Sequence, residues 1–124
     1  MNHTWIWDGR EYPFDISESE CMERMCRALA VLREAVGGLG EKGISETIRE
    51  QCRIIRGFFD AVLGDGTGVE ICGEAYSADA HTTAYVEFIL FVNEQIGAYR
   101  SKMEAVEARY MHRAAQSQGE AYGA

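Results

Sequence analysis

The glycine-rich segment after Asp60 is the first place in this chain where the residue types suggest chemistry. Its run GDGTG, at 64–68, could hold a phosphate group or, together with Asp60, a calcium ion. A phosphate-binding P-loop needs a lysine followed by serine or threonine after its second glycine, and this run has no lysine. A calcium-binding loop needs a glutamate at its twelfth position, which is Ile71 when counted from Asp60. We therefore interpret Gly64 as the end of a helix and the rest as a turn.

The histidines do not form a catalytic set. His3, His81 and His112 lie far apart in the sequence, and no serine or cysteine stands in a recognisable nucleophile motif. His81 falls in the first turn of the last predicted helix, where we expect a solvated surface residue. The sequence therefore predicts no catalytic residue and a protein that is not an enzyme.

The four cysteines are Cys21, Cys26, Cys52 and Cys72. None of them belongs to a Cys-x-x-Cys pair, and the first two are five residues apart, a spacing that does not place two side chains well on one helix face. This pattern favours free thiols, buried or half-buried as small hydrophobic residues, over metal ligands. We expect no metal and no cofactor.

Length and hydropathy restrict the class of protein. The 124 residues fit one domain with a modest core. No run of eighteen uncharged apolar residues is present, so we expect no transmembrane helix. The first residues have neither the basic nor the apolar region of a secretory signal, which leads us to expect a cytoplasmic protein without a membrane partner.

Charge is distributed unevenly along the chain, whose net charge is −8. Residues 1–97 contain 17 acidic and 8 basic residues, whereas residues 98–124 contain 3 acidic and 4 basic ones. The acidic body disfavours direct nucleic-acid binding, because it repels phosphates. The slightly basic end could attract the acidic body of another copy or an acidic partner, but acidity also serves solubility alone.

Residues 4–13 predict a β-hairpin with an Asp-Gly loop, which sets Trp5 opposite Tyr12 on one face. An isolated two-stranded hairpin is marginally stable in water, so this one must pack on the helices or extend the sheet of a neighbouring molecule. We expect its aromatic residues Trp5, Trp7 and Tyr12 to form an interaction surface.

Two helices are predicted next, over about 18–36 and about 46–63. A Ser-x-x-Glu capping box from Ser17 to Glu20 begins the first, and Ser45 begins the second. Apolar residues recur in both at steps of three and four, and glycines end both helices. Because a short glycine-rich loop joins them, they predict an antiparallel pair.

Three arginines lie beside the apolar face of the second helix: Arg49, Arg53 and Arg56. They either dock carboxylates of a partner or flank the core with their charged ends in solvent. Because Glu46 and Glu50 are close in sequence, we favour the second interpretation.

The last helix is expected over about 78–116, after a short helical turn at 69–72 and before a frayed tail at 117–124. Its apolar residues recur at steps of three and four: Tyr85, Phe88, Val92, Ile96, Tyr99, Met103, Val106 and Tyr110. Unbroken, this helix is about 60 Å long, whereas a domain of this size is about 35 Å across. The part after Gly97 would overhang unless the chain folds back there, and we favour continuity because one glycine does not by itself break a helix.

The overhanging stripe is the main predicted interaction surface. It consists of Tyr99, Met103, Val106 and Tyr110. An apolar face without an intramolecular partner usually finds an intermolecular one, so we expect a protein partner and a homo-oligomer. The expected fold is one mainly α domain over 1–116, with an N-terminal β-hairpin, an antiparallel helix pair, a short helical turn and a long C-terminal helix.

The order of these elements resembles small tail proteins of Firmicutes phages and prophages that are regarded as tail assembly chaperone-like. The segments that carry the resemblance are WDGREYPFD, SESECMERM, IIRGFFDAVLGDGTGVEICGE and AYVEFILFVNEQI, within residues 5–97. The resemblance implies a helical cytoplasmic protein of phage assembly that coats the tape-measure protein and helps recruit tail-tube subunits. It does not extend past Tyr99.

The acidic body supports a second hypothesis, that of a phage-borne inhibitor that occupies a basic nucleic-acid-binding surface of a host defence protein. Such binding is sensitive to salt, whereas assembly through apolar surfaces tolerates salt. Salt dependence therefore discriminates between the two.

Overall fold

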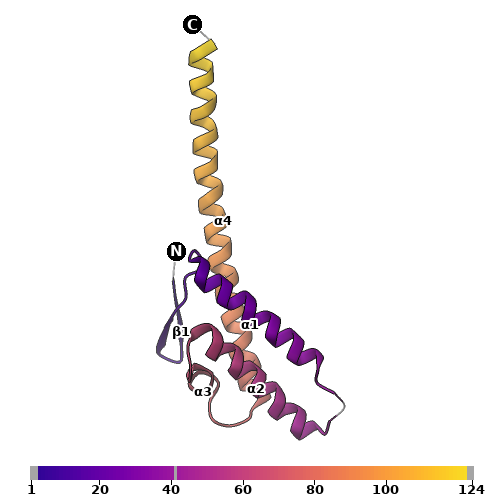
Figure 1. Ribbon diagram of the computed structural model, residues 1–124. Coiled ribbons are helices and arrows are strands. Elements are labelled where there is room, and N and C mark those ends of the chain that lie inside the picture. The colour runs from indigo at the N-terminus through magenta and orange to yellow at the C-terminus, as the bar shows by residue number, and fades with distance from the viewer. Residues whose placement is uncertain (1–2, 41, 123–124) are drawn as a thin grey trace.

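The computed structural model describes residues 3–40 and 42–122, with side chains as far as residue 113. The chain is mainly helical, with an N-terminal β-hairpin and a long C-terminal helix, which confirms the predicted fold class (Figure 1). The elements are β1 (Thr4–Trp7), β2 (Arg10–Pro13), α1 (Ser19–Gly37), α2 (Ile44–Leu63), α3 (Thr67–Cys72) and α4 (Ala78–Tyr122). The predicted helix limits agree with these bounds to within two residues, except at the end of α4.

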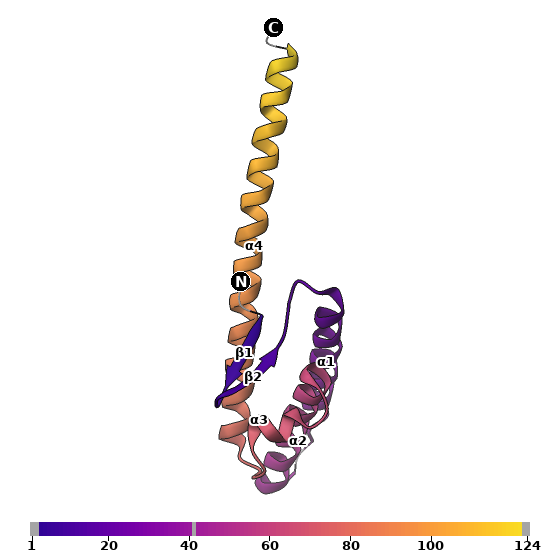
Figure 2. The same cartoon turned by 90° about the vertical axis from the view of Figure 1, so that its left-hand side faces the viewer.

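The strands β1 and β2 form the predicted antiparallel hairpin, with Trp5 opposite Tyr12. Asp8 and Gly9 have φ values of 50° and 75°, the left-handed conformations that a type I′ turn requires. The hairpin lies against the helices (Figure 2), and the indole N–H of Trp7 donates a hydrogen bond to a backbone carbonyl of α3. Packing on the helices, one of the two arrangements that we expected, therefore stabilises this small sheet.

The core of the body is a cluster of aromatic rings around Phe88, which is fully buried on α4. The centroid of its ring lies 5.1 Å from Trp5, 5.5 Å from Phe14 and 5.7 Å from Phe59, in edge-to-face geometry. A strand, a loop and α2 thus each contribute one ring to the same contact. This cluster fixes the hairpin, α2 and the first half of α4 relative to one another.

The start of α1 differs from the expectation of a capping box. The helix begins at Ser19 after Glu18, and no side chain caps it. The backbone N–H and the hydroxyl of Ser17 instead donate hydrogen bonds to the carboxylate of Asp15, at 2.9 Å and 2.6 Å. The capping-box prediction is wrong, because these two hydrogen bonds place Ser17 in a turn before the helix, which begins two residues later.

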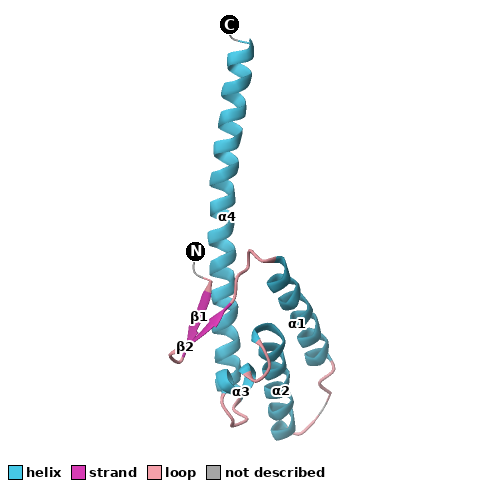
Figure 3. Ribbon diagram, turned by 60° about the vertical axis from the view of Figure 1, so that its left-hand side comes forward, coloured by secondary structure: helices cyan, strands magenta, loops and turns pink. Residues whose placement is uncertain are grey.

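The helix α4 has 45 residues, is about 68 Å long and continues through Gly97 without a break, which confirms the predicted continuity (Figure 3). It runs past the predicted end at 116 to Tyr122, so the frayed tail expected at 117–124 is wrong as far as Tyr122, and 123–124 lie outside the described residues. The last turns contain glutamine, glutamate and alanine, which are good helix formers, and a single serine or glycine weakens a helix without ending it.

Candidate interaction surfaces

The second half of α4 projects from the body into solvent (Figure 1). From 97 to 113 every residue is exposed. The predicted stripe lies on this segment, and all four of its side chains are exposed: Tyr99, Met103, Val106 and Tyr110. The structure thus brings these residues together on one helix face, and their role in binding stays a prediction.

The stripe continues the face of α4 that the body covers. Val92 is buried in the core, and Tyr99 and Val106 follow it at intervals of seven residues. Seven residues bring an α-helix back to the same face with a drift of only about 20°. The exposed stripe and the buried core of α4 are therefore two halves of a single apolar face, one covered and one open.

Charged side chains flank the stripe on both edges. At about 100° per residue, one edge is wholly basic and the other is mixed. The basic edge holds Lys102, Arg109 and Arg113, and the mixed edge holds Arg100, Glu104 and Glu107. The open face is thus an apolar centre with charged borders, which is the pattern of a helix that packs against another helix.

The hairpin aromatics are not the exposed surface that we expected. Trp5 and Tyr12 are only 5% and 6% exposed, and Trp7 is half-buried. The ring of Trp5 stacks on Phe59, and the hydroxyl of Tyr12 donates a hydrogen bond to a carboxylate oxygen of Glu70. The predicted second surface is wrong, because these large rings are the hairpin's own contribution to the core.

His81 is also placed differently from the expectation of a solvated residue, since it is completely buried at the start of α4. Its Nε2 accepts a hydrogen bond from the Nε–H of Arg56 at 2.9 Å, and its Nδ1 lies 2.7 Å from the carbonyl oxygen of Ser77. Because Arg56 can only donate and a carbonyl can only accept, the ring must be neutral, with its proton on Nδ1. Arg56 also donates to the carbonyls of Gly73, Glu74 and Ala75.

The free energy of unfolding is expected to fall as the pH is lowered below the pKa of an ordinary histidine. Burial lowers the pKa of His81 below its usual 6.5. Below about pH 6.5 the imidazole is therefore protonated in the unfolded chain while it is still neutral in the folded chain. Stability is fully present above about pH 6.5 and decreases by up to about 1.4 kcal/mol per pH unit towards the folded-state pKa. Urea denaturation between pH 7.5 and 5 measures this, and His81→Gln should remove most of the slope. An unchanged slope in the variant would contradict the assignment.

The glycine-rich segment after Asp60 forms a structural turn. A carboxylate oxygen of Asp60 accepts a hydrogen bond from the backbone N–H of Gly68 at 2.8 Å, and the hydroxyl of Thr67 donates to the carbonyls of Phe59 and Gly64. The polar groups that suggested phosphate or calcium chemistry are therefore used to join α2 to α3. This agrees with the interpretation of a helix end followed by a turn.

Three of the four free cysteines are buried, and Cys26 is exposed, which corrects the expectation of burial for that residue. Burial raises the pKa of Cys72 to about 11, so its thiol stays protonated and a poor nucleophile near neutral pH. Within the described part of the chain, no group of three or more histidine, cysteine or acidic residues could hold a metal ion. None of the helices there is long and apolar enough to cross a membrane.

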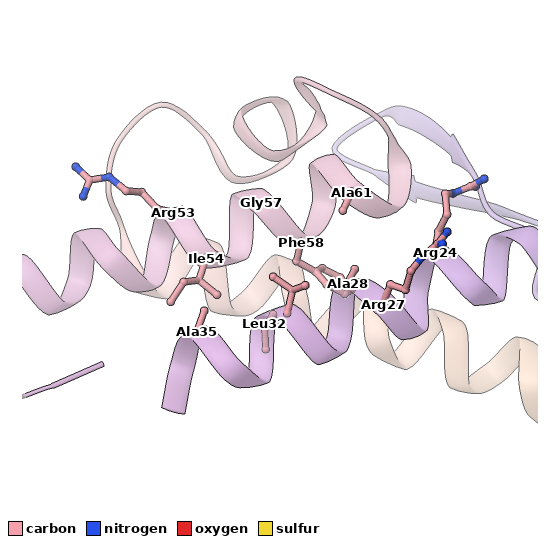
Figure 4. A pocket seen from close by; sticks show the side chains of 11 residues that line it. Arg24, Arg27, Ala28, Leu32, Ala35, Arg53, Ile54, Gly57, Phe58 and Ala61 are labelled. Atoms are coloured by element: carbon pink, nitrogen blue, oxygen red, sulfur yellow. The ribbon is translucent and has the colours of Figure 1, made fainter. Parts of the chain in front are cut away.

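A groove between α1 and α2 is a surface that the sequence did not reveal. It has a volume of about 600 Å³ (Figure 4). Its middle is apolar, with Leu32 and Ile54 over Phe58, and arginines stand at its ends. Periodicity shows which residues of each helix face inward. It does not show how wide a gap remains between two packed helices where their facing side chains are small. The only available signal was the set of small residues at helical spacing: Ala28, Ala35, Gly57 and Ala61.

Comparison with protein families identifies one matching family. The model of the Family of unknown function (DUF6673) matches residues 8–121. No match is found among curated proteins or among solved structures.

Proposed function

The chain belongs to the Family of unknown function (DUF6673), and we propose that it is a non-enzymatic assembly factor that binds a helix of another protein through the exposed half of α4. The observation that carries this proposal is the apolar face of α4, which leaves the body at Gly97 and continues uncovered. Helix-in-groove and helix-on-helix contacts use this kind of surface, with apolar anchors at steps of three and four.

The position of the body limits what can cover this face. In a parallel, in-register pair of copies, both bodies would occupy the space between the two helices, because the body lies on the same face as the stripe. A second copy can use the stripe only in an antiparallel arrangement with the bodies at opposite ends. A helix from a different protein meets no such obstacle, and we therefore propose it as the main partner and an antiparallel homo-oligomer as the competing arrangement.

The setting that we propose is the assembly of a phage tail in the host cytoplasm. The resemblance of residues 5–97 to tail assembly chaperone-like proteins supports this setting and makes the tape-measure protein the proposed partner, with the tail-tube protein as a second one. The helix α4 extends about 38 Å beyond Gly97, and the open stripe from Tyr99 to Tyr110 occupies about 17 Å of that length, enough to contact a helix of the tape-measure protein over about three turns.

Binding of a tape-measure fragment tests this proposal. The double variant Met103→Glu/Val106→Glu is expected to bind the fragment at least about ten-fold more weakly, because it buries two carboxylates in an apolar contact. Ser101→Glu/Ala108→Glu is the matched control, since it adds the same charges on the opposite face of α4, which is also exposed. Titration by fluorescence anisotropy gives both affinities. Equal losses in the two variants would contradict a contact through the stripe.

Light scattering separates the arrangements. A monomer that joins the fragment in a single complex supports a foreign helix, whereas a dimer that Met103→Glu/Val106→Glu converts to a monomer supports the antiparallel pair. The second hypothesis, an acidic inhibitor of a basic nucleic-acid-binding protein, predicts instead that the chain binds a basic target and that salt weakens this binding strongly.

A further inference from the structure

The groove between α1 and α2 is long enough to bind a third helix. On α1 it is lined from Arg24 to Ala35, about three helical turns or about 16 Å. Small residues on both helices, including Ala28 and Gly57, keep its walls low, and small side chains let a further helix approach closely. A volume of about 600 Å³ spread along two antiparallel helices is an open trough, not a closed pocket for a small molecule.

The lining of the groove is apolar and partly open to solvent. Phe58 forms its buried floor, and Leu32 and Ile54 are half-buried beside it. Val31 lines the groove and is 67% exposed, which is a high value for a β-branched apolar residue next to other apolar side chains. A partner that covers these residues would remove apolar surface from water.

All charged residues of the groove are basic, although the body carries a net charge of −9. They are Arg24, Arg27 and Arg53, at the two ends of the apolar floor (Figure 4). Among the described residues, Arg27 has no ion-pair partner, and Arg24 donates a hydrogen bond to the sulfur of Cys21. Arg53, in contrast, pairs with Glu50, which Lys42 also contacts, and its guanidinium lies 5.7 Å from the ring centroid of Tyr76. The groove is therefore a positive patch within an acidic body, and Arg24 and Arg27, at one of its ends, have no ion-pair partner among the described residues.

We infer that this groove binds an amphipathic helix of a partner protein whose apolar face is bordered by carboxylates. Apolar anchors would fill the trough, and aspartate or glutamate residues about three turns apart would meet the arginines at its ends, where bidentate pairing is available. The inference does not depend on the stripe of α4, which lies on a different part of the molecule.

Two synthetic peptides of about 18 residues test this inference with the full chain. Both carry leucines at steps of three and four, and they differ only in having glutamates or lysines along the borders of the leucine face. Fluorescence anisotropy is expected to show at least about ten-fold tighter binding of the glutamate peptide. Equal affinities, or no binding of either peptide up to about 1 mM, would overturn the inference.

Variants locate the binding. Val31→Glu and the triple variant Arg24→Gln/Arg27→Gln/Arg53→Gln are each expected to weaken the glutamate peptide at least about ten-fold, and neither removes a buried side chain. Ile6→Glu is the control, because Ile6 is similarly exposed, at 63%, on the outer face of the hairpin. If Met103→Glu/Val106→Glu abolished binding and the groove variants did not, the peptide would lie on α4 and the inference would be wrong.

Discussion

Replacing Phe88 with alanine is expected to lower the free energy of unfolding by about 3–5 kcal/mol, the range found for buried phenylalanine residues. The side chain is fully buried and its ring contacts those of three elements that are distant in sequence. The cavity that the substitution leaves cannot close easily, because the neighbouring rings of Trp5 and Phe59 are stacked on each other and Phe58 packs edge-to-face on Phe59. Since domains of this size are stable by about 5–15 kcal/mol, a large part of the total stability would be lost.

Urea denaturation of the two proteins measures this loss, and Leu90→Ala is the matched control. Leu90 lies two residues further along the same helix and is 50% exposed, so its truncation is expected to cost well under half as much as that of Phe88. A Phe88→Ala variant whose unfolding midpoint matched that of the control would mean that the aromatic cluster does not hold the body together.

Gly68→Ala is expected to destabilise the protein by about 3 kcal/mol, at the upper end of the range for overpacking. A Cβ atom at this position would lie 2.7 Å from the Cα of Arg56 and 2.9 Å from its carbonyl carbon, which are backbone atoms and cannot turn aside. α3 would have to move away from α2, and the hydrogen bond from the Gly68 N–H to Asp60 would be stretched. Arg56 itself holds the loop before α4, so the displacement would spread to the buried His81.

The control for this variant is Gly97→Ala. Like Gly68, Gly97 lies in a helix, but it is exposed, and a Cβ atom there would meet no atom within 4 Å. Because alanine is the better helix former, this substitution is expected to raise stability or helix content, by up to about 1 kcal/mol. Circular dichroism and thermal unfolding compare both variants with the parent chain. Similar effects of the two substitutions would contradict the close contact of α3 with α2.

Much of the fold could be predicted from local sequence patterns. The Asp-Gly pair fixed the turn and register of the hairpin, since few residues tolerate the left-handed conformation that a two-residue loop needs. Steps of three and four located the helices to within two residues at most of their ends. The prediction that α4 continues past Gly97 succeeded for the same reason, because the propensity of the neighbouring residues outweighs that of one glycine.

Two of the wrong expectations, those for the hairpin aromatics and for His81, share a cause, which is that a local pattern does not state what packs against a residue from elsewhere in the chain. Trp5 and Tyr12 occupy one face of a hairpin whether that face meets solvent or a helix, and the structure buries them. His81 stands at a helix start, where solvent is the usual neighbour, but Arg56 from α2 reaches it across the fold. The start of α1 differs for a local reason, because the hydroxyl of Ser17 donates to Asp15, two residues earlier in the chain.

The stripe of α4 and the groove between α1 and α2 also differ in how much of each could be predicted from the sequence. The sequence by itself determined that α4 has one apolar face that is too long for the body, because periodicity and length are properties of the chain alone. Only the tertiary structure decided that the body covers the first half of that same face, which is the reason why we propose a foreign helix or an antiparallel copy as the partner. The groove between α1 and α2 and its arginine ends likewise exist only after two helices pack, because the distance between helices depends on side chains that meet from different parts of the chain.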